Sequence, residues 1–175
     1  MVRISRALDL PPRSFVSLCP TEPDAADGVQ FERAGLKYQL VLNKRGAVRA
    51  AGAPCIFLWK LSDGHAQCGL GALRPLVCRA YPASLADGLL CAAGDACTCR
   101  RWSVSDLDPE ADKAALHAVL EEAQRYSLAV DAWNAALPPP PAQRSFSEFC
   151  QFAFAAEDEY LAGQRGGSGG IDARP

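Results

Sequence analysis

The chain lacks the features that mark several common protein classes. No stretch approaches the roughly 18 consecutive apolar residues of a membrane span, and the N-terminal segment Met1–Pro12 has no apolar run long enough for a signal peptide. The charge is almost balanced, with 18 Lys and Arg residues against 20 Asp and Glu residues, so the basic face of a nucleic-acid-binding protein is not expected. We therefore expect a cytoplasmic protein that binds neither membranes nor nucleic acids.

Sequence signatures of common catalytic sites are also missing. The chain contains no phosphate-binding loop, no nucleophile elbow and no dinucleotide-binding fingerprint. Histidine is scarce, with 2 residues. His65 lies three residues before Cys68 and is a candidate ligand, whereas His117 fits a surface or packed position on a predicted helix. The sequence identifies no catalytic residue and leaves open whether the protein is an enzyme.

Cysteine, by contrast, is abundant and clustered. Six of the eight cysteines lie between Cys55 and Cys99. Cytoplasmic thiols stay reduced, so such a cluster indicates metal or redox chemistry rather than structural disulfides. The gaps are 12 residues from Cys55 to Cys68, nine from Cys68 to Cys78, and 18 from Cys78 to Cys97. These gaps suit a site assembled by several loops, and they do not match the tight pairs of zinc ribbons or the spacings of ferredoxins.

Two arginines flank the third cysteine of this cluster. Arg74 and Arg79 lie on either side of Cys78, where they can offset the negative charge of several thiolates as groups next to the metal ligands. The competing interpretation is that they are surface or salt-bridge residues.

The pattern of apolar residues predicts an α+β fold in which small, irregular antiparallel strands and cysteine-bearing loops pack against two C-terminal helices. Residues 20–28 read as a loop and residues 29–42 as two strands. Asp87-Gly88 predicts a hairpin turn. Helical spacing predicts a helix over 109–137, with Asp108 as its N-cap. We expect a domain over 1–137, a Pro-rich linker over 138–144, a helix over 145–162 with a capping box, and a disordered tail over 163–175.

The cysteine region resembles the YkgJ-type cysteine-cluster family, described as a zinc- or iron-chelating domain and related to the flagellin lysine N-methylases. The resemblance covers about residues 3–102. Its most specific block is Arg74-Pro75-x-x-Cys78-Arg79-x-Tyr81-Pro82, preceded by Pro54-Cys55-Ile56-Phe57-Leu58, Asp63-Gly64 and Cys68.

One part of the family pattern is missing from this chain. Family members usually carry a further Cys-x-x-Cys-x-x-Cys-Cys-like cluster before the first helix, and this chain starts at that helix. Two interpretations stay open. Either the start is assigned too far downstream and the site is only partly present, or this is a divergent member in which fewer cysteines hold the metal, or none do.

The resemblance implies that Cys55, Cys68 and Cys78 are metal ligands, because they match the family blocks. The family has a further cysteine after the Tyr-Pro segment, and here Cys97 or Cys99, or both, take that place. The remaining cysteines fit packing better. Cys91 falls on a predicted strand, Cys19 has apolar neighbours and Cys150 lies on an aromatic helix face.

We therefore expect a cytoplasmic metal-binding protein whose cysteines hold an iron–sulfur cluster or zinc, two cofactors that cysteine count alone does not separate. Three alternatives stay open. The relation to the methylases implies a protein lysine N-methyltransferase-related enzyme. A structural zinc module would bind an unknown protein partner through the helix 109–137. A thiol redox protein would use Cys97-x-Cys99 beside Arg100-Arg101.

Overall fold

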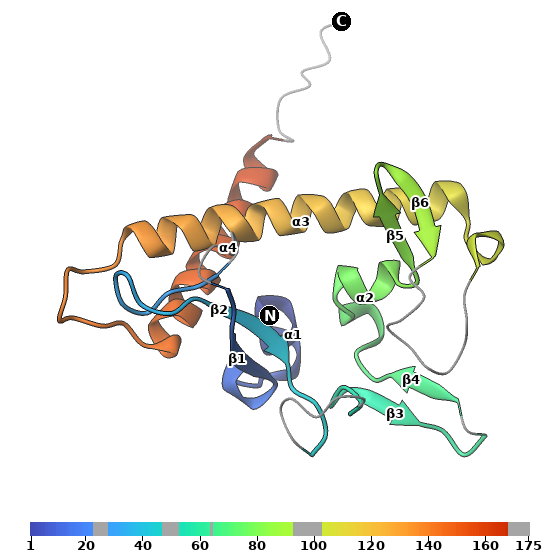
Figure 1. Ribbon diagram of the computed structural model, residues 1–175, viewed down its shortest axis with the longest axis horizontal. Coiled ribbons are helices and arrows are strands. Elements are labelled where there is room, and N and C mark those ends of the chain that lie inside the picture. Colours follow the sequence, from blue (N-terminus) through green and yellow to red (C-terminus); the bar gives the residue numbers. More distant parts are fainter. Residues whose placement is uncertain (23–27, 47–52, 64, 93–102, 168–175) are drawn as a thin grey trace, which may run out of the picture. The chain divides into compact units, whose positions relative to one another are not determined.

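The computed structural model describes residues 1–22, 28–46, 53–63, 65–92 and 103–167. It confirms the α+β class, with pairs of short antiparallel strands and two long C-terminal helices (Figure 1). The chain forms two compact units. Unit 1 comprises Met1–Leu58 and Ser127–Pro175, and unit 2 comprises Trp59–Tyr126. The long helix α3 (Pro109–Ala135) contributes its first part to unit 2 and its last part to unit 1.

Unit 1 contains a two-stranded sheet that the sequence predicted only in part. Strand β2 (Tyr38–Leu42) forms where expected, but its partner is β1 (Val16–Pro20), paired from Val16↔Leu42 to Pro20↔Tyr38. The segment that begins at Val29 makes only an isolated bridge with Tyr38. Two strands within residues 29–42 were therefore the wrong prediction, since one of the two strands lies further upstream.

Side chains of α3 explain why the segment around Gln30 does not extend into a ladder. Asn134 accepts a hydrogen bond from the Gln30 N–H (2.9 Å) and donates one to the Gly28 carbonyl (2.9 Å). The indole N–H of Trp133 donates to the Gln30 carbonyl (2.7 Å). These backbone groups are thus satisfied by a helix instead of by a neighbouring strand.

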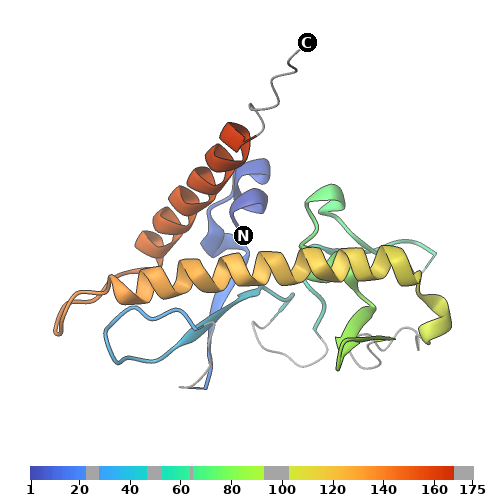
Figure 2. The same ribbon diagram turned by 90° about the horizontal axis from the view of Figure 1, so that it is seen from above.

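The core of unit 1 is aromatic. Trp133 is 1% exposed and packs edge-to-face on Phe149, with ring centroids 5.4 Å apart. The short helix α1 (Val2–Leu8) lies beside α4 (Phe146–Gly167), as Figure 2 shows. There Arg6 pairs with Asp158 (2.8 Å) and lies over the Phe154 ring.

The two long helices begin as predicted and end differently. Asp108 caps α3 by accepting hydrogen bonds from the backbone N–H groups of Glu110 and Ala111. Ser145 and Glu148 form the capping box of α4. Helix α3 ends at Ala135, two residues before the predicted end. Helix α4 continues to Gly167, so residues 163–167 are helical rather than a disordered tail, and residues 168–175 lie outside the described part.

The proline-rich linker over 138–144 is folded against unit 1. The Ala142 N–H donates to the Pro139 carbonyl (3.2 Å), closing a turn. The Arg144 N–H then donates to the Phe31 carbonyl (2.7 Å). The linker therefore reverses the chain and fixes the start of α4 instead of acting as an extended spacer.

Unit 2 is built from two small hairpins, a short helix and the start of α3. Strands β3 (Leu58–Lys60) and β4 (Ala66–Cys68) form one pair, and β5 (Ala83–Ala86) and β6 (Leu89–Ala92) form the other (Figure 1). The predicted turn at Asp87-Gly88 is confirmed. Both residues have positive φ, 50° and 77°, as a two-residue hairpin turn of type I′ requires.

Single helical turns connect these elements, and Pro75 and Pro82 limit the length of the one that carries Cys78. They are η2 (Gly71–Leu73), α2 (Leu76–Ala80) and η3 (Val104–Asp106), with η1 (Pro12–Ser14) the matching element of unit 1. The buried cluster of unit 2 is small. It consists of Ala80, Ala83, Leu107 and Leu116, with the β5–β6 hairpin packed against it.

Candidate functional site

The predicted metal ligands lie on different elements of the fold. Cys55 is in unit 1, where it forms an isolated bridge with Lys44 and is half-buried. Cys68 ends strand β4 and is half-buried, and Cys78 lies in the middle of α2 and is exposed. Cys97 and Cys99 fall outside the described residues.

The described part of the chain does not by itself assemble a metal site. No group of three or more His, Cys, Asp or Glu side chains among the described residues is placed to hold a metal ion. Cys68 and Cys78 belong to unit 2 and Cys55 to unit 1. Convergence of the five predicted cysteines therefore stays a prediction.

Of the two predicted charge-compensating arginines, one contacts the backbone of Cys78. The guanidinium of Arg74 donates two hydrogen bonds to the Cys78 carbonyl oxygen, from Nε at 2.9 Å and from Nη2. This carbonyl is in the last turn of α2, where helix carbonyls lack partners within the helix. Arg79 is exposed on α2, and its backbone N–H donates to the Pro75 carbonyl. Arg74 therefore closes the C-terminal end of the helix that carries Cys78.

The other cysteines are placed as packing residues would be. Cys150 is 8% exposed on α4, and this burial raises the pKa of its thiol to about 11. Cys19 on β1 and Cys91 on β6 are half-buried, and the Cys91 sulfur lies 3.5 Å from the Leu89 carbonyl oxygen. His65 is exposed, and its backbone N–H donates to Asp63 Oδ1.

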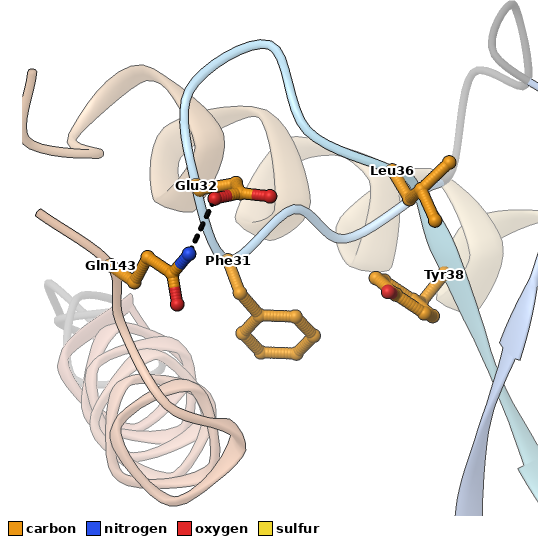
Figure 3. A pocket seen from close by; sticks show the side chains of 5 residues that line it. All are labelled: Phe31, Glu32, Leu36, Tyr38 and Gln143. Atoms are coloured by element: carbon orange, nitrogen blue, oxygen red, sulfur yellow. Dashed lines mark hydrogen bonds between the residues drawn. The ribbon is translucent and has the colours of Figure 1, made fainter. Parts of the chain in front are cut away.

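A second candidate site, which the sequence did not reveal, is a small hollow on unit 1 that we call the Glu32 hollow. It has a volume of about 160 Å³ and is lined by Phe31, Glu32, Leu36, Tyr38 and Gln143. Figure 3 shows the carboxylate of Glu32 on one side of this hollow, with Leu36 and Tyr38 at its far end. A single acidic group therefore lies among aromatic and aliphatic surfaces.

Local structure fixes the position of Glu32. The Gly35 N–H donates to the Glu32 carbonyl (3.1 Å), closing a turn, and Gln30 Nε2 donates to the Gly35 carbonyl (2.9 Å). A Cβ atom at Gly35 would lie 2.3 Å from Glu32 Cγ, so only glycine lets the Glu32 side chain fold back over the turn. Gln143 Nε2 then donates to Glu32 Oε2 at 2.6 Å (Figure 3).

Comparison with known proteins finds no family model, no curated protein and no solved structure that matches this chain. None of the helices among the described residues is long and apolar enough to cross a membrane.

Sequence reasoning missed the Glu32 hollow because its residues come from distant segments. Gln143 is 111 residues from Glu32 and reaches it only when the proline-rich linker turns back. The one local signal was the Glu32–Gly35 segment, which places a glycine at the end of a four-residue turn. That signal predicts a turn but not a pocket.

Proposed function

We propose that this protein binds an iron–sulfur cluster or zinc through cysteines of the segment 55–99, in the reducing environment of the cytoplasm. The proposed ligands are Cys55, Cys68 and Cys78, completed by Cys97, Cys99 or both. The observation that carries the proposal is the small apolar core of unit 2.

Unit 2 buries little apolar surface for its length. Its buried apolar side chains among the described residues are Leu70, Leu107 and Leu116, with Ala80 and Ala83. It also leaves large apolar groups in water, since Trp59 is 62% exposed, Val77 65% and Leu89 70%. Below about 70–80 residues a single core rarely supplies more than about 3–5 kcal/mol, and natural mini-proteins add disulfides, a structural metal, oligomerisation or exceptionally tight packing.

The chemistry of unit 2 favours metal over disulfides as the additional stabilising element. Cys68 and Cys91 form no disulfide, and four of the five proposed ligands, together with Cys91, fall within this unit. Cys78 is presented on a helix whose end is closed by the Arg74 guanidinium. That cation lies at the backbone of a proposed ligand, where it would offset negative charge from thiolates.

The decisive experiment is anaerobic purification followed by metal analysis and an absorption spectrum. A broad visible absorption band with bound iron and sulfide supports the cluster, and a colourless protein with stoichiometric zinc supports the zinc site. Cys78→Ser should lower the metal content sharply, because a thiolate ligand is lost. Cys19→Ser, on β1 of unit 1, is the matched control and should keep the metal.

Metal removal should also act selectively on folding. Because metal binding contributes folding free energy, a chelator should reduce hydrogen-exchange protection in β5, β6 and α2, while α4 in unit 1 keeps its protection. Equal metal content in Cys78→Ser and Cys19→Ser, or a protein that takes up neither zinc nor iron with sulfide on reconstitution, would rule the proposal out.

A further inference from the structure

The Glu32 hollow has an acceptor that the described residues leave available. Glu32 Oε2 accepts the hydrogen bond from Gln143. Oε1 accepts none from the described residues, and in Figure 3 it points away from Gln143, across the hollow. A carboxylate oxygen fixed beside a hollow attracts a hydrogen-bond donor, and a positively charged donor most strongly.

The aromatic walls favour the same sign of charge. The Phe31 and Tyr38 rings lie 5.7 Å apart at an interplanar angle of 50°, and Phe146 packs on Phe31 edge-on, at 6.5 Å and 82°. The faces of such rings carry negative electrostatic potential and attract cations. The carboxylate and the rings are therefore complementary to one positive group.

Two arginines close to the hollow in the sequence are directed elsewhere. Arg33 Nη2 donates to the Leu137 carbonyl (3.0 Å). The Arg144 guanidinium lies over the Trp133 ring, 4.9 Å from its centroid. These two arginines are the sequence neighbours of Glu32 and Gln143, and neither is a partner of Glu32.

Geometry distinguishes an ammonium from a guanidinium. A guanidinium binds a carboxylate best through two parallel hydrogen bonds to both oxygens, and here Gln143 already occupies one oxygen. An ammonium is a point charge that needs only one strong acceptor. Leu36 is 60% exposed at the far end of the hollow, where it can cover the methylene stem of an aliphatic side chain.

We propose that the Glu32 hollow binds the ammonium end of a lysine side chain presented by a partner protein. A hollow of about 160 Å³ desolvates little more than the end of a side chain. Specific association needs a larger buried surface than that, so the remaining contacts come from the partner's surface around its lysine. The proposal is independent of metal binding, because none of the five lining residues is a proposed metal ligand.

The test uses the full-length, isotope-labelled protein and three probes. Acetyl-Gly-Lys-Gly-amide is titrated while amide resonances of Glu32, Gly35, Leu36 and Gln143 are followed by NMR. The norleucine analogue, which lacks the charge, and n-butylamine, which lacks the peptide, are titrated in the same way. Saturable shifts are expected with the lysine peptide, weaker binding with both other probes, and weaker lysine binding at higher salt.

Variants link the binding to Glu32. Glu32→Gln should weaken lysine-peptide binding about two- to fivefold, the range for an exposed ion pair. Gly35→Ala should weaken it as well, because the added Cβ displaces the Glu32 side chain. Glu159→Gln, the same chemical change on the exposed part of α4, should leave binding unchanged.

Several results would overturn the proposal. Equal affinity for the lysine and norleucine peptides would show that charge is not recognised. Tighter or equal binding of n-butylamine would indicate a small-amine site instead of a protein-docking site. Unchanged binding in Glu32→Gln, or no saturable shift with the lysine peptide, would remove the site altogether.

Discussion

Trp133 is the largest fully buried side chain among the described residues, and replacing it with Phe tests the packing of unit 1. The indole is 1% exposed. Its ring contacts Phe149 and Phe152 of α4, at 5.4 and 5.6 Å between centroids. Its N–H holds the Gln30 carbonyl at 2.7 Å. Trp133→Phe keeps an aromatic ring but removes the donor and part of the packed surface.

The expected loss of stability has two parts. A buried carbonyl left without its donor costs about 1–3 kcal/mol. For the Gln30 carbonyl we expect the lower half of that range, because Gln30 is half-buried and water can replace the lost donor. The smaller ring leaves a gap against Phe149 and Phe152, which adds roughly 1 kcal/mol. The free energy of unfolding of unit 1 should fall by about 2–3 kcal/mol.

Native-state hydrogen exchange in β1, β2 and α4 measures this loss, because these elements belong to unit 1. Trp59→Phe is the matched control. Trp59 is 62% exposed, so the same substitution should change stability by no more than about 0.5 kcal/mol. A Trp133→Phe protein as stable as Trp59→Phe would refute the packing and the hydrogen bond described for Trp133.

Three further predictions concern pH and a turn. Burial raises the pKa of the Cys150 thiol from 9.0 to about 11, so this thiol should stabilise the fold fully below pH 9 and progressively less up to about pH 11. In Cys150→Ala the free energy of unfolding should fall less steeply between pH 9 and pH 11. The same fall in both proteins would contradict the burial. Hydrogen bonds from the backbone N–H and the hydroxyl of Ser145 lower the pKa of Glu148 from 4.5. Hydrogen-exchange protection of the first turn of α4 should therefore be complete above pH 4.5 and be lost at more acid pH. Glu148→Gln removes the titrating group and should abolish this pH dependence. Gly88 has a φ of 77°, so Gly88→Ala should destabilise the β5–β6 hairpin by about 1–2 kcal/mol. Hydrogen exchange of the β5 and β6 amides measures this loss, and unchanged protection would disprove the turn assignment.

Local signals in the sequence were enough to locate several elements. The Asp87-Gly88 turn, the Asp108 cap and the Ser145–Glu148 capping box all form as predicted. In each case the chemistry acts within a few residues, so the sequence carries all the information needed. The sequence also predicted Cys150 as a packing residue, because its neighbours on the helix are aromatic.

Pairing between distant segments was not predictable in the same way. Residues 29–31 had the composition of a strand. Their backbone groups instead form hydrogen bonds with the side chains of Trp133 and Asn134 on α3, and β2 pairs with β1. The Glu32 hollow has the same origin, since Gln143 approaches Glu32 only after the linker folds back. Such contacts depend on which surfaces are buried together, which periodicity in one segment does not encode.

The sequence alone predicted metal binding by the clustered cysteines, because thiolates that converge on one centre are good ligands for zinc and iron, and this stays a prediction. It also determined the helix caps and the β5–β6 turn. Tertiary structure alone decided that Cys55 belongs to unit 1 while Cys68 and Cys78 belong to unit 2, and that a glutamate and a glutamine from opposite ends of the chain share one hydrogen bond. The physical reason is that capping and turn formation are local, whereas burial joins residues regardless of their separation in the chain.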